Sequence, residues 1–157
     1  MLPCVSPPSD VASDLLYDDD YVSVIRRDHP GIVTGVSVAD FCAAPQVFLG
    51  YCRSALDDLI DQVLGRAGRR RQAQVAVTSF AQMAELLRRT DHLAVFPARV
   101  ASRYQDSLAA HPLPFELPRY GMYLCWNHRA GDDPGIQWLR DRIVALACPR
   151  TMISFDE

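Results

Sequence analysis

The feature that most constrains the fold of this chain is a regular alternation between strand-like and helix-like segments. Residues 21–25 read Tyr-Val-Ser-Val-Ile, a β-branched and aromatic run that is typical of a strand. Farther along, apolar side chains recur at the spacing of one helix face, and polar side chains lie between them: Leu56, Leu59, Ile60, Val63 and Leu64 against Asp57, Asp58, Asp61 and Gln62. The alternation predicts an α/β domain with a largely parallel sheet and helices on both faces.

The same reasoning assigns the remaining elements. We expect strands at 21–25, 46–49, 73–77, 92–96 and 121–127, with a short extended piece at 115–117. We expect helices at 38–44, 56–64, 80–89, 98–108 and 134–147. Pro134 fits the first turn of the last helix, and Gly65 and Gly68 are stop signals for the second.

Length and composition favour one globular domain. The chain has 157 residues, of which 49% are hydrophobic and 22% are charged, far from the composition of disordered proteins. A domain of this size buries roughly 70% of the surface of its unfolded chain, so it needs no disulfide or structural metal. We expect a loose leader at 1–13, the domain at 14–148 and a tail at 149–157.

The cysteines and the N-terminus predict a cytoplasmic protein. Five cysteines stand singly, without a C-x-x-C pair, and read as reduced thiols: Cys4, Cys42, Cys52, Cys125 and Cys148. The first ten residues contain prolines and serines where a signal peptide would have a basic segment and an apolar run. The longest apolar stretches are too short for a membrane span.

The charge of the chain argues against DNA binding by these residues alone. The formal net charge is -3, so the chain lacks the global attraction to phosphates that dominates DNA affinity. The basic run 66–71 is better explained as the end of a helix, where cations complement the dipole and glycine provides a cap.

No catalytic or metal-binding motif is recognisable, so we expect no enzyme, cofactor or metal. The sequence contains no G-x-S-x-G, Walker A, G-x-G-x-x-G or H-E-x-x-H motif. The four histidines are far apart and are interpreted as structural: His29, His92, His111 and His128. The acidic run 18–20 is interpreted as a solvated turn rather than a cation site.

The most suggestive local site is Val77-Thr78-Ser79-Phe80. Two hydroxyl residues between a strand and a helix place backbone N–H groups and the positive end of a helix dipole where an anion could bind. In open α/β sheets, ligands bind at the carboxyl ends of the strands. Ordinary capping of the helix by Thr78 or Ser79, without a ligand, explains the same residues and is favoured on sequence alone.

The order of several motifs resembles the effector-binding domain of LysR-type transcriptional regulators. The resemblance covers roughly residues 14–147 and consists of loose motifs in one order. These are the strand and turn ending in Arg26-Arg27-Asp28-His29-Pro30, the strand 44–49, the helix 56–68, the turn 76–80, the segment 93–101, and the closing Trp126-Asn127-His128-Arg129 with Pro134 and Trp138-Leu139-Arg140.

This resemblance implies a fold and a function. Such domains have two α/β subdomains of periplasmic-binding-protein type, with a small, often aromatic or carboxylate-bearing effector in the cleft between them. Residue by residue, it implicates Gly50, Tyr51, Thr78, Ser79, Phe80, Phe96 and Pro97 in effector binding. It also implies that DNA would be read by a helix-turn-helix domain, which this sequence does not contain.

The departures from the family pattern shape the remaining expectations. Most of the first subdomain is absent, which predicts an exposed apolar edge formed by the segments 21–25 and 121–127 and the last helix. We expect the chain to form a homodimer through that edge. The leading interpretation is a non-enzymatic sensor fragment. The alternatives are an interaction module that docks on full-length relatives, a vestigial fragment, or a small α/β enzyme without a local signature.

Overall fold

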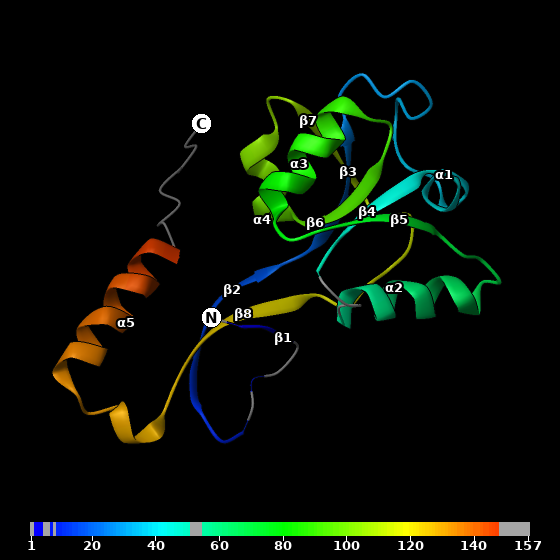
Figure 1. Cartoon of the computed structure of the whole chain (residues 1–157). Coiled ribbons are helices and arrows are strands. Elements are labelled where there is room, and N and C mark those ends of the chain that lie inside the picture. The colour runs from blue at the N-terminus through cyan, green and yellow to red at the C-terminus, as the bar shows by residue number, and fades with distance from the viewer. Residues whose placement is uncertain (1, 5–6, 8, 51–54, 148–157) are drawn as a thin grey trace, which may run out of the picture. The chain divides into compact units, whose positions relative to one another are not determined.

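The computed structural model describes residues 2–4, 7, 9–50 and 55–147, and the chain divides into two compact units (Figure 1). Unit 1 consists of Met1–Asp19 and Pro118–Glu157, and unit 2 of Asp20–Leu117. The expected tail at 149–157 lies outside the described residues. None of the helices in the described ranges combines the length and hydrophobicity that crossing a bilayer requires.

Unit 2 is built on a five-stranded sheet. Its strands are β3 (Tyr21–Arg26), β4 (Pro45–Leu49), β5 (Gln72–Val77), β6 (Leu93–Pro97) and β7 (Leu108–Pro112), in the spatial order β5-β4-β6-β3-β7. β4 is parallel to β5 and β6, whereas β3 is antiparallel to both of its neighbours, β6 and β7. The predicted α/β class is confirmed, and the sheet is mixed: β5, β4 and β6 pair in parallel, whereas both pairings of β3 are antiparallel.

Helices cover both faces of this sheet (Figure 1). Helix α3 (Phe80–Arg89) and the short helix α4 (Ala98–Ala101) pack on the face that includes Val24, Val47, Ala94 and Phe96. Helices α1 (Val38–Ala43) and α2 (Ala55–Arg66) pack on the opposite face, which includes Ile25 and Leu93. Adjacent residues Val24 and Ile25 thus belong to different cores and are each 1% exposed, because successive side chains of a strand point to opposite faces.

The Arg26-Arg27-Asp28-His29-Pro30 turn is held by its own side chains. Arg26 forms ion pairs of 2.7 Å with Asp28 and with Asp91. The Nδ1 atom of His29 accepts hydrogen bonds from the backbone N–H groups of Gly31 and Ile32, and its Nε2 atom lies 3.2 Å from the backbone oxygen of Asp91. The prediction of a structural role for His29 agrees with these contacts.

Several of the predicted elements between residues 98 and 117 are wrong. One long helix was expected at 98–108, but α4 ends at Ala101 and continues as the 3₁₀ helix η1 (Ser102–Tyr104). Strand β7 follows and was not predicted, because Leu-Ala-Ala-His-Pro lacks the β-branched residues that mark a strand. It becomes a strand by pairing with the open side of β3, and Pro112 is tolerated at the sheet edge. The extended piece expected at 115–117 is not a strand in the structure.

The end of helix α2 confirms one prediction and corrects another. Gly68 has a positive φ of 66°, and the N–H of Arg69 donates to the backbone oxygen of Leu64, so glycine does end this helix. Arg71, however, does more than complement the helix dipole: its guanidinium lies 2.8 Å from Asp57 and 2.8 Å from Asp61. Asp57 was predicted on the solvent face and is instead 6% exposed beneath Arg71.

Unit 1 contains a three-stranded antiparallel sheet. Strands β1 (Leu2–Cys4) and β2 (Ala12–Asp19) flank β8 (Tyr120–Trp126), so the segment expected to be a loose leader contains a paired strand. Strand β2 was not predicted, and the solvated turn expected at 18–20 is wrong for Asp18 and Asp19, which belong to this strand. Asp19 is 6% exposed, and the Tyr120 hydroxyl donates to its carboxylate at 3.1 Å, joining β8 to the end of β2. After η2 (His128–Ala130), helix α5 (Pro134–Ala147) runs over the predicted residues.

Helix α5 is attached to its sheet by a charged residue rather than by a buried apolar stripe. Arg140 donates to Asp14 at 2.8 Å and lies 3.8 Å from the ring centroid of Trp126. Ile136, Ile143 and Ala147 are half-buried on the same side, whereas Leu139 is 47% exposed. No described residue of α5 is fully buried.

Large exposed apolar side chains concentrate in unit 1. Apart from Val33, those in the described residues belong to β2 or α5: Leu15, Trp138, Leu139, Val144 and Leu146. The prediction of apolar exposure on the last helix is therefore confirmed. The predicted edge was wrong for residues 21–25 and 121–127, because β3 and β8 are interior strands that are each paired on both sides.

Candidate functional site

The expected site residues follow three neighbouring strands at the same edge of the unit 2 sheet. Gly50 follows β4, Thr78 follows β5, and Pro97 ends β6. The three strands are adjacent and parallel, in the order β5-β4-β6, so their carboxyl ends come together. The structure thus brings the predicted residues to the edge where α/β sheets bind ligands.

At this edge, helix α3 begins with a reciprocal cap. The hydroxyl of Ser79 accepts a hydrogen bond of 3.2 Å from the N–H of Gln82. The side-chain oxygen of Gln82 in turn accepts from the backbone N–H of Thr78 at 3.0 Å and from its hydroxyl at 2.9 Å. Both hydroxyls therefore support the helix start, which is the capping role that the sequence favoured.

The cap leaves several polar groups directed at the edge. The N–H groups of the first turn of a helix have no partner within the helix, and its dipole places partial positive charge there. Gln82 occupies the N–H of Thr78, and the Ser79 hydroxyl occupies the N–H of Gln82. The N–H groups of Phe80 and Ala81, in the first turn of the helix, belong to residues between these two in the sequence. This arrangement favours an anion such as a carboxylate.

Gly50 lets the chain turn beside this cap. Its N–H donates to the backbone oxygen of Val77 at 2.8 Å, which ties the end of β4 to the end of β5. Its φ of 127° lies in a region that side chains other than glycine rarely adopt. Tyr51, the neighbouring predicted contact, lies outside the described residues.

The aromatic residues of the predicted site have different roles. Phe80 is half-buried, and its ring centroid lies 5.1 Å from that of Phe96. Phe96 is 0% exposed and also contacts Tyr104 edge-on, at 6.2 Å. Phe96 was expected to contact the effector, but in this structure its ring lies in the core and packs against the ring of Phe80.

Sequence reasoning missed two residues at this edge. β3 runs opposite to the parallel strands, so its first residues lie beside their carboxyl ends. Tyr21 pairs with Pro97, and the N–H of Ala98 donates to the backbone oxygen of Asp20 at 2.8 Å. Finding these residues would have required the direction of β3 relative to its neighbours. The alternation of apolar and polar residues does not show whether two strands pair in parallel or antiparallel.

The described residues include no group of three or more His, Cys, Asp or Glu side chains placed to hold a metal ion. The histidines are dispersed, and His92 is engaged by Thr90, whose hydroxyl lies 2.9 Å from Nδ1. Cys42 and Cys125 are half-buried free thiols. The other three cysteines lie outside the described side chains.

Comparisons with known proteins agree on one family. The family model described as the LysR substrate binding domain matches residues 1–147. The chain is 34% identical to the HTH-type transcriptional regulator SyrM of Rhizobium meliloti over 137 residues, covering 84% of this chain and 41% of that protein. It is 31% identical to the HTH-type transcriptional activator NagR of a Ralstonia species, covering 83% of this chain and 44% of that protein.

A solved structure shows the same architecture. The regulatory domain of MexT, a transcriptional activator in Pseudomonas aeruginosa, superposes with a TM-score of 0.73 at 25% identity. The match covers 88% of this chain and 69% of that domain. The chain spans less than half the length of the curated relatives that it matches.

Proposed function

The chain belongs to the LysR substrate-binding domain family, and from this membership we propose that it is the effector-sensing part of a DNA-binding transcriptional regulator. SyrM and NagR are named as HTH-type regulators, and this chain corresponds to less than half of each. In the proposed arrangement a helix-turn-helix domain reads DNA in the cytoplasm. This chain converts the binding of a small molecule into a change of conformation and catalyses no reaction.

The proposed effector is a small carboxylate, with an aromatic ring as the favoured body. The observation that carries this proposal is the first turn of α3, which begins at the carboxyl edge of the sheet beside the tight backbone turn at Gly50. The carboxylate is proposed to lie against the N–H groups of Phe80 and Ala81, close to Thr78 and Ser79. The half-buried ring of Phe80 supplies an apolar contact, and Pro97 and Tyr51 complete the proposed contacts.

Thermal unfolding with a panel of small aromatic and aliphatic carboxylates tests this proposal. A ligand at a hundred times its dissociation constant adds about 2.7 kcal/mol to the folded state. Thr78→Val removes the hydroxyl at the start of α3, and Thr90→Val removes the hydroxyl that donates to the Leu86 oxygen at the other end of the same helix. A midpoint rise that survives in Thr90→Val but not in Thr78→Val supports the site.

Ser79→Ala requires a separate reference. Loss of this cap costs about 1 kcal/mol without any ligand, so its ligand-induced shift is compared with its own ligand-free midpoint. If no carboxylate raises the midpoint of the unmodified chain, the proposed effector class is wrong, and an interaction module or a vestigial fragment becomes the better explanation.

We also propose that the chain forms a homodimer through the apolar surface of unit 1. This proposal is supported by the exposure of Trp138 at 60% and Leu146 at 82% on α5. Leu146→Lys is expected to convert a dimer into a monomer in light scattering. Val33→Lys, which changes an equally exposed residue in unit 2, is expected to leave the dimer intact. A monomeric mass for the unmodified chain at micromolar concentration contradicts the proposal.

A further inference from the structure

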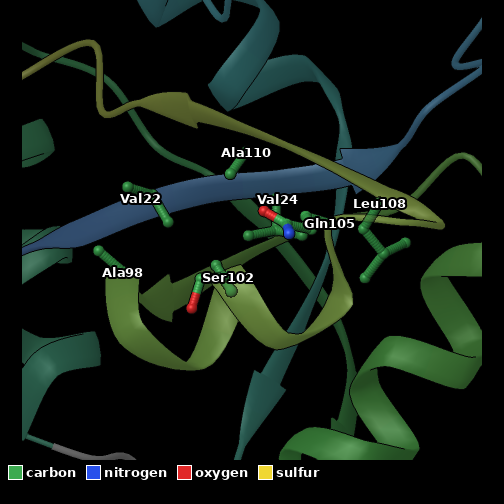
Figure 2. A pocket seen from close by; sticks show the side chains of 8 residues that line it. Val22, Val24, Ala98, Ser102, Gln105, Leu108 and Ala110 are labelled. Carbon is green, nitrogen blue, oxygen red and sulfur yellow. The ribbon is translucent and has the colours of Figure 1, made fainter. Parts of the chain in front are cut away.

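A hollow lies within unit 2 that does not include the first turn of α3. Its floor consists of Val22 and Val24 on β3 with Leu108 and Ala110 on β7. Its opposite wall is the helical segment α4–η1 and the residue that follows it, through Ala98, Ala101, Ser102 and Gln105 (Figure 2). The cavity has a volume of about 250 Å³.

The hollow exists because a short helical segment with small side chains crosses the edge of a sheet. α4 contains four residues, of which Ala98 and Ala101 face the strands, and Ala110 on the edge strand is equally small. Val24 pairs directly with Ala110, so a large and a small side chain stand next to each other on this face. The adjacent rings of Phe96 and Tyr104 fill the neighbouring core but not this corner.

The walls of the cavity select the charge of an occupant. None of the lining side chains is ionisable, and Val24, Ala101 and Leu108 are at most 5% exposed. A carboxylate placed against these walls would lose hydration, which is costly, and the cation at the mouth, Arg27, is already bound to the backbone oxygen of Gln105. The cavity therefore fits a neutral molecule, in contrast to the anion-favouring start of α3.

Two polar groups at the mouth select the substituent. Arg27 binds the backbone oxygen of Gln105, which fixes the backbone there, while the Gln105 amide has no hydrogen-bond partner within the part of the chain that the structure describes. The Ser102 hydroxyl donates to the backbone oxygen of Arg99 at 2.9 Å and keeps its capacity to accept. A ligand with one uncharged donor and acceptor group matches this pair.

The size of the cavity selects a single ring. A dry apolar cavity of about 150 Å³ is enough to bind benzene. The present hollow is larger, at about 250 Å³, and opens to solvent at the exposed residues Ser102, Gln105 and Ala110, so it has room for one ring with a small substituent at the mouth. We propose that this cavity is a binding site for neutral, single-ring aromatic compounds that carry an amide or hydroxyl group, distinct from the carboxylate site.

Benzamide and benzoate form a matched pair of probes, because they share ring and shape and differ in charge. Titration of the full chain with benzamide, followed by methyl NMR, is expected to shift the signals of Val22, Val24 and Leu108 with a dissociation constant of about 1 mM. Benzoate is expected to leave these signals unchanged. Equal shifts from both compounds, or none from benzamide up to its solubility limit, would overturn the proposal.

Three variants check the location of binding. Gln105→Ala is expected to weaken benzamide binding about tenfold, whereas Gln62→Ala, an equally exposed glutamine on α2, leaves it unchanged. Ala110→Leu fills the cavity from the exposed edge strand and is expected to abolish binding while the chain stays folded. Because Thr78→Val is expected not to affect benzamide, failure here is distinguishable from failure of the carboxylate site. Unchanged affinity in Ala110→Leu contradicts the proposed location.

Discussion

Replacing Arg71 with methionine should destabilise the chain strongly, although the residue ends an arginine-rich surface run. The Arg71 side chain is 6% exposed and that of its partner Asp57 is 9% exposed, at 2.8 Å. Arg71 also donates to the backbone oxygen of Asp57 at 3.2 Å. Burial lowers the pKa of the Arg71 guanidinium, but the bonds to Asp61 and Asp57 outweigh it, so the pKa lies above its ordinary value. The guanidinium stays charged and the pair is ionic.

The expected loss follows from what remains after the substitution. Methionine keeps the apolar stem of the side chain but removes the guanidinium that lies 2.8 Å from the buried Asp57 carboxylate, and breaking a buried pair costs about 3–5 kcal/mol. The Asp61 bond adds little, because that side chain is 38% exposed and such pairs contribute about 0–1 kcal/mol. We expect a decrease of about 3 kcal/mol in the free energy of unfolding.

Urea denaturation measures this difference, with Arg70→Met as the control on an exposed neighbour. The double variant Asp57→Leu with Arg71→Met should recover most of the loss, because an apolar pair can replace a buried ion pair of similar volume. If Arg71→Met lies within about 0.5 kcal/mol of the Arg70→Met control, the buried-pair reasoning is refuted.

Three further predictions follow from local contacts. His29→Ala removes the Nδ1 atom that accepts hydrogen bonds from the N–H groups of Gly31 and Ile32. We expect the free energy of unfolding, measured by chemical denaturation, to fall by about 1–2 kcal/mol, and His29→Asn to restore part of it. The Ser37 hydroxyl and N–H hold the pKa of Asp40 below its ordinary value, so this cap stabilises above the unfolded-state pKa and is lost as the pH falls through the lower folded-state value. The stability difference between the unmodified chain and Ser37→Ala should therefore shrink between about pH 7 and pH 3, and a constant difference would contradict the assignment. Arg140→Met removes the cation from the Trp126 ring and should accelerate hydrogen exchange in α5 more than Arg142→Met, which removes a 5.6 Å contact with Trp138 of the same helix.

The elements that the sequence predicted best are those with local signals. Helix α3 runs over the predicted residues because its cap, apolar spacing and length are all written within one segment. The same is true of α5, which begins at the proline expected in its first turn. The ordered LysR-type motifs likewise identified the family that the comparisons show.

The site could be predicted only in part. The strand-to-helix turn at Thr78 and Ser79 was expected at the carboxyl edge, and it lies there as a helix cap. Whether an aromatic ring faces a ligand or the core is set by neighbours distant in sequence, and Phe96 is enclosed between Phe80 and Tyr104. The pattern of apolar residues is the same in both cases.

By itself the sequence determined the α/β class, the family and most element boundaries, because hydrophobic period and capping act over a few residues. Only the tertiary structure decided which partners distant segments found. Residues 108–112 became a strand because β3 offered unpaired backbone groups at its side. The Asp57 carboxylate is buried because Arg71, 14 residues later in the chain, packs on helix α2 and donates a hydrogen bond to it. The physical reason is that the conformation of a hydrogen-bonding or ionic group depends on its partner, and only folding of the chain brings partners that are distant in sequence close together.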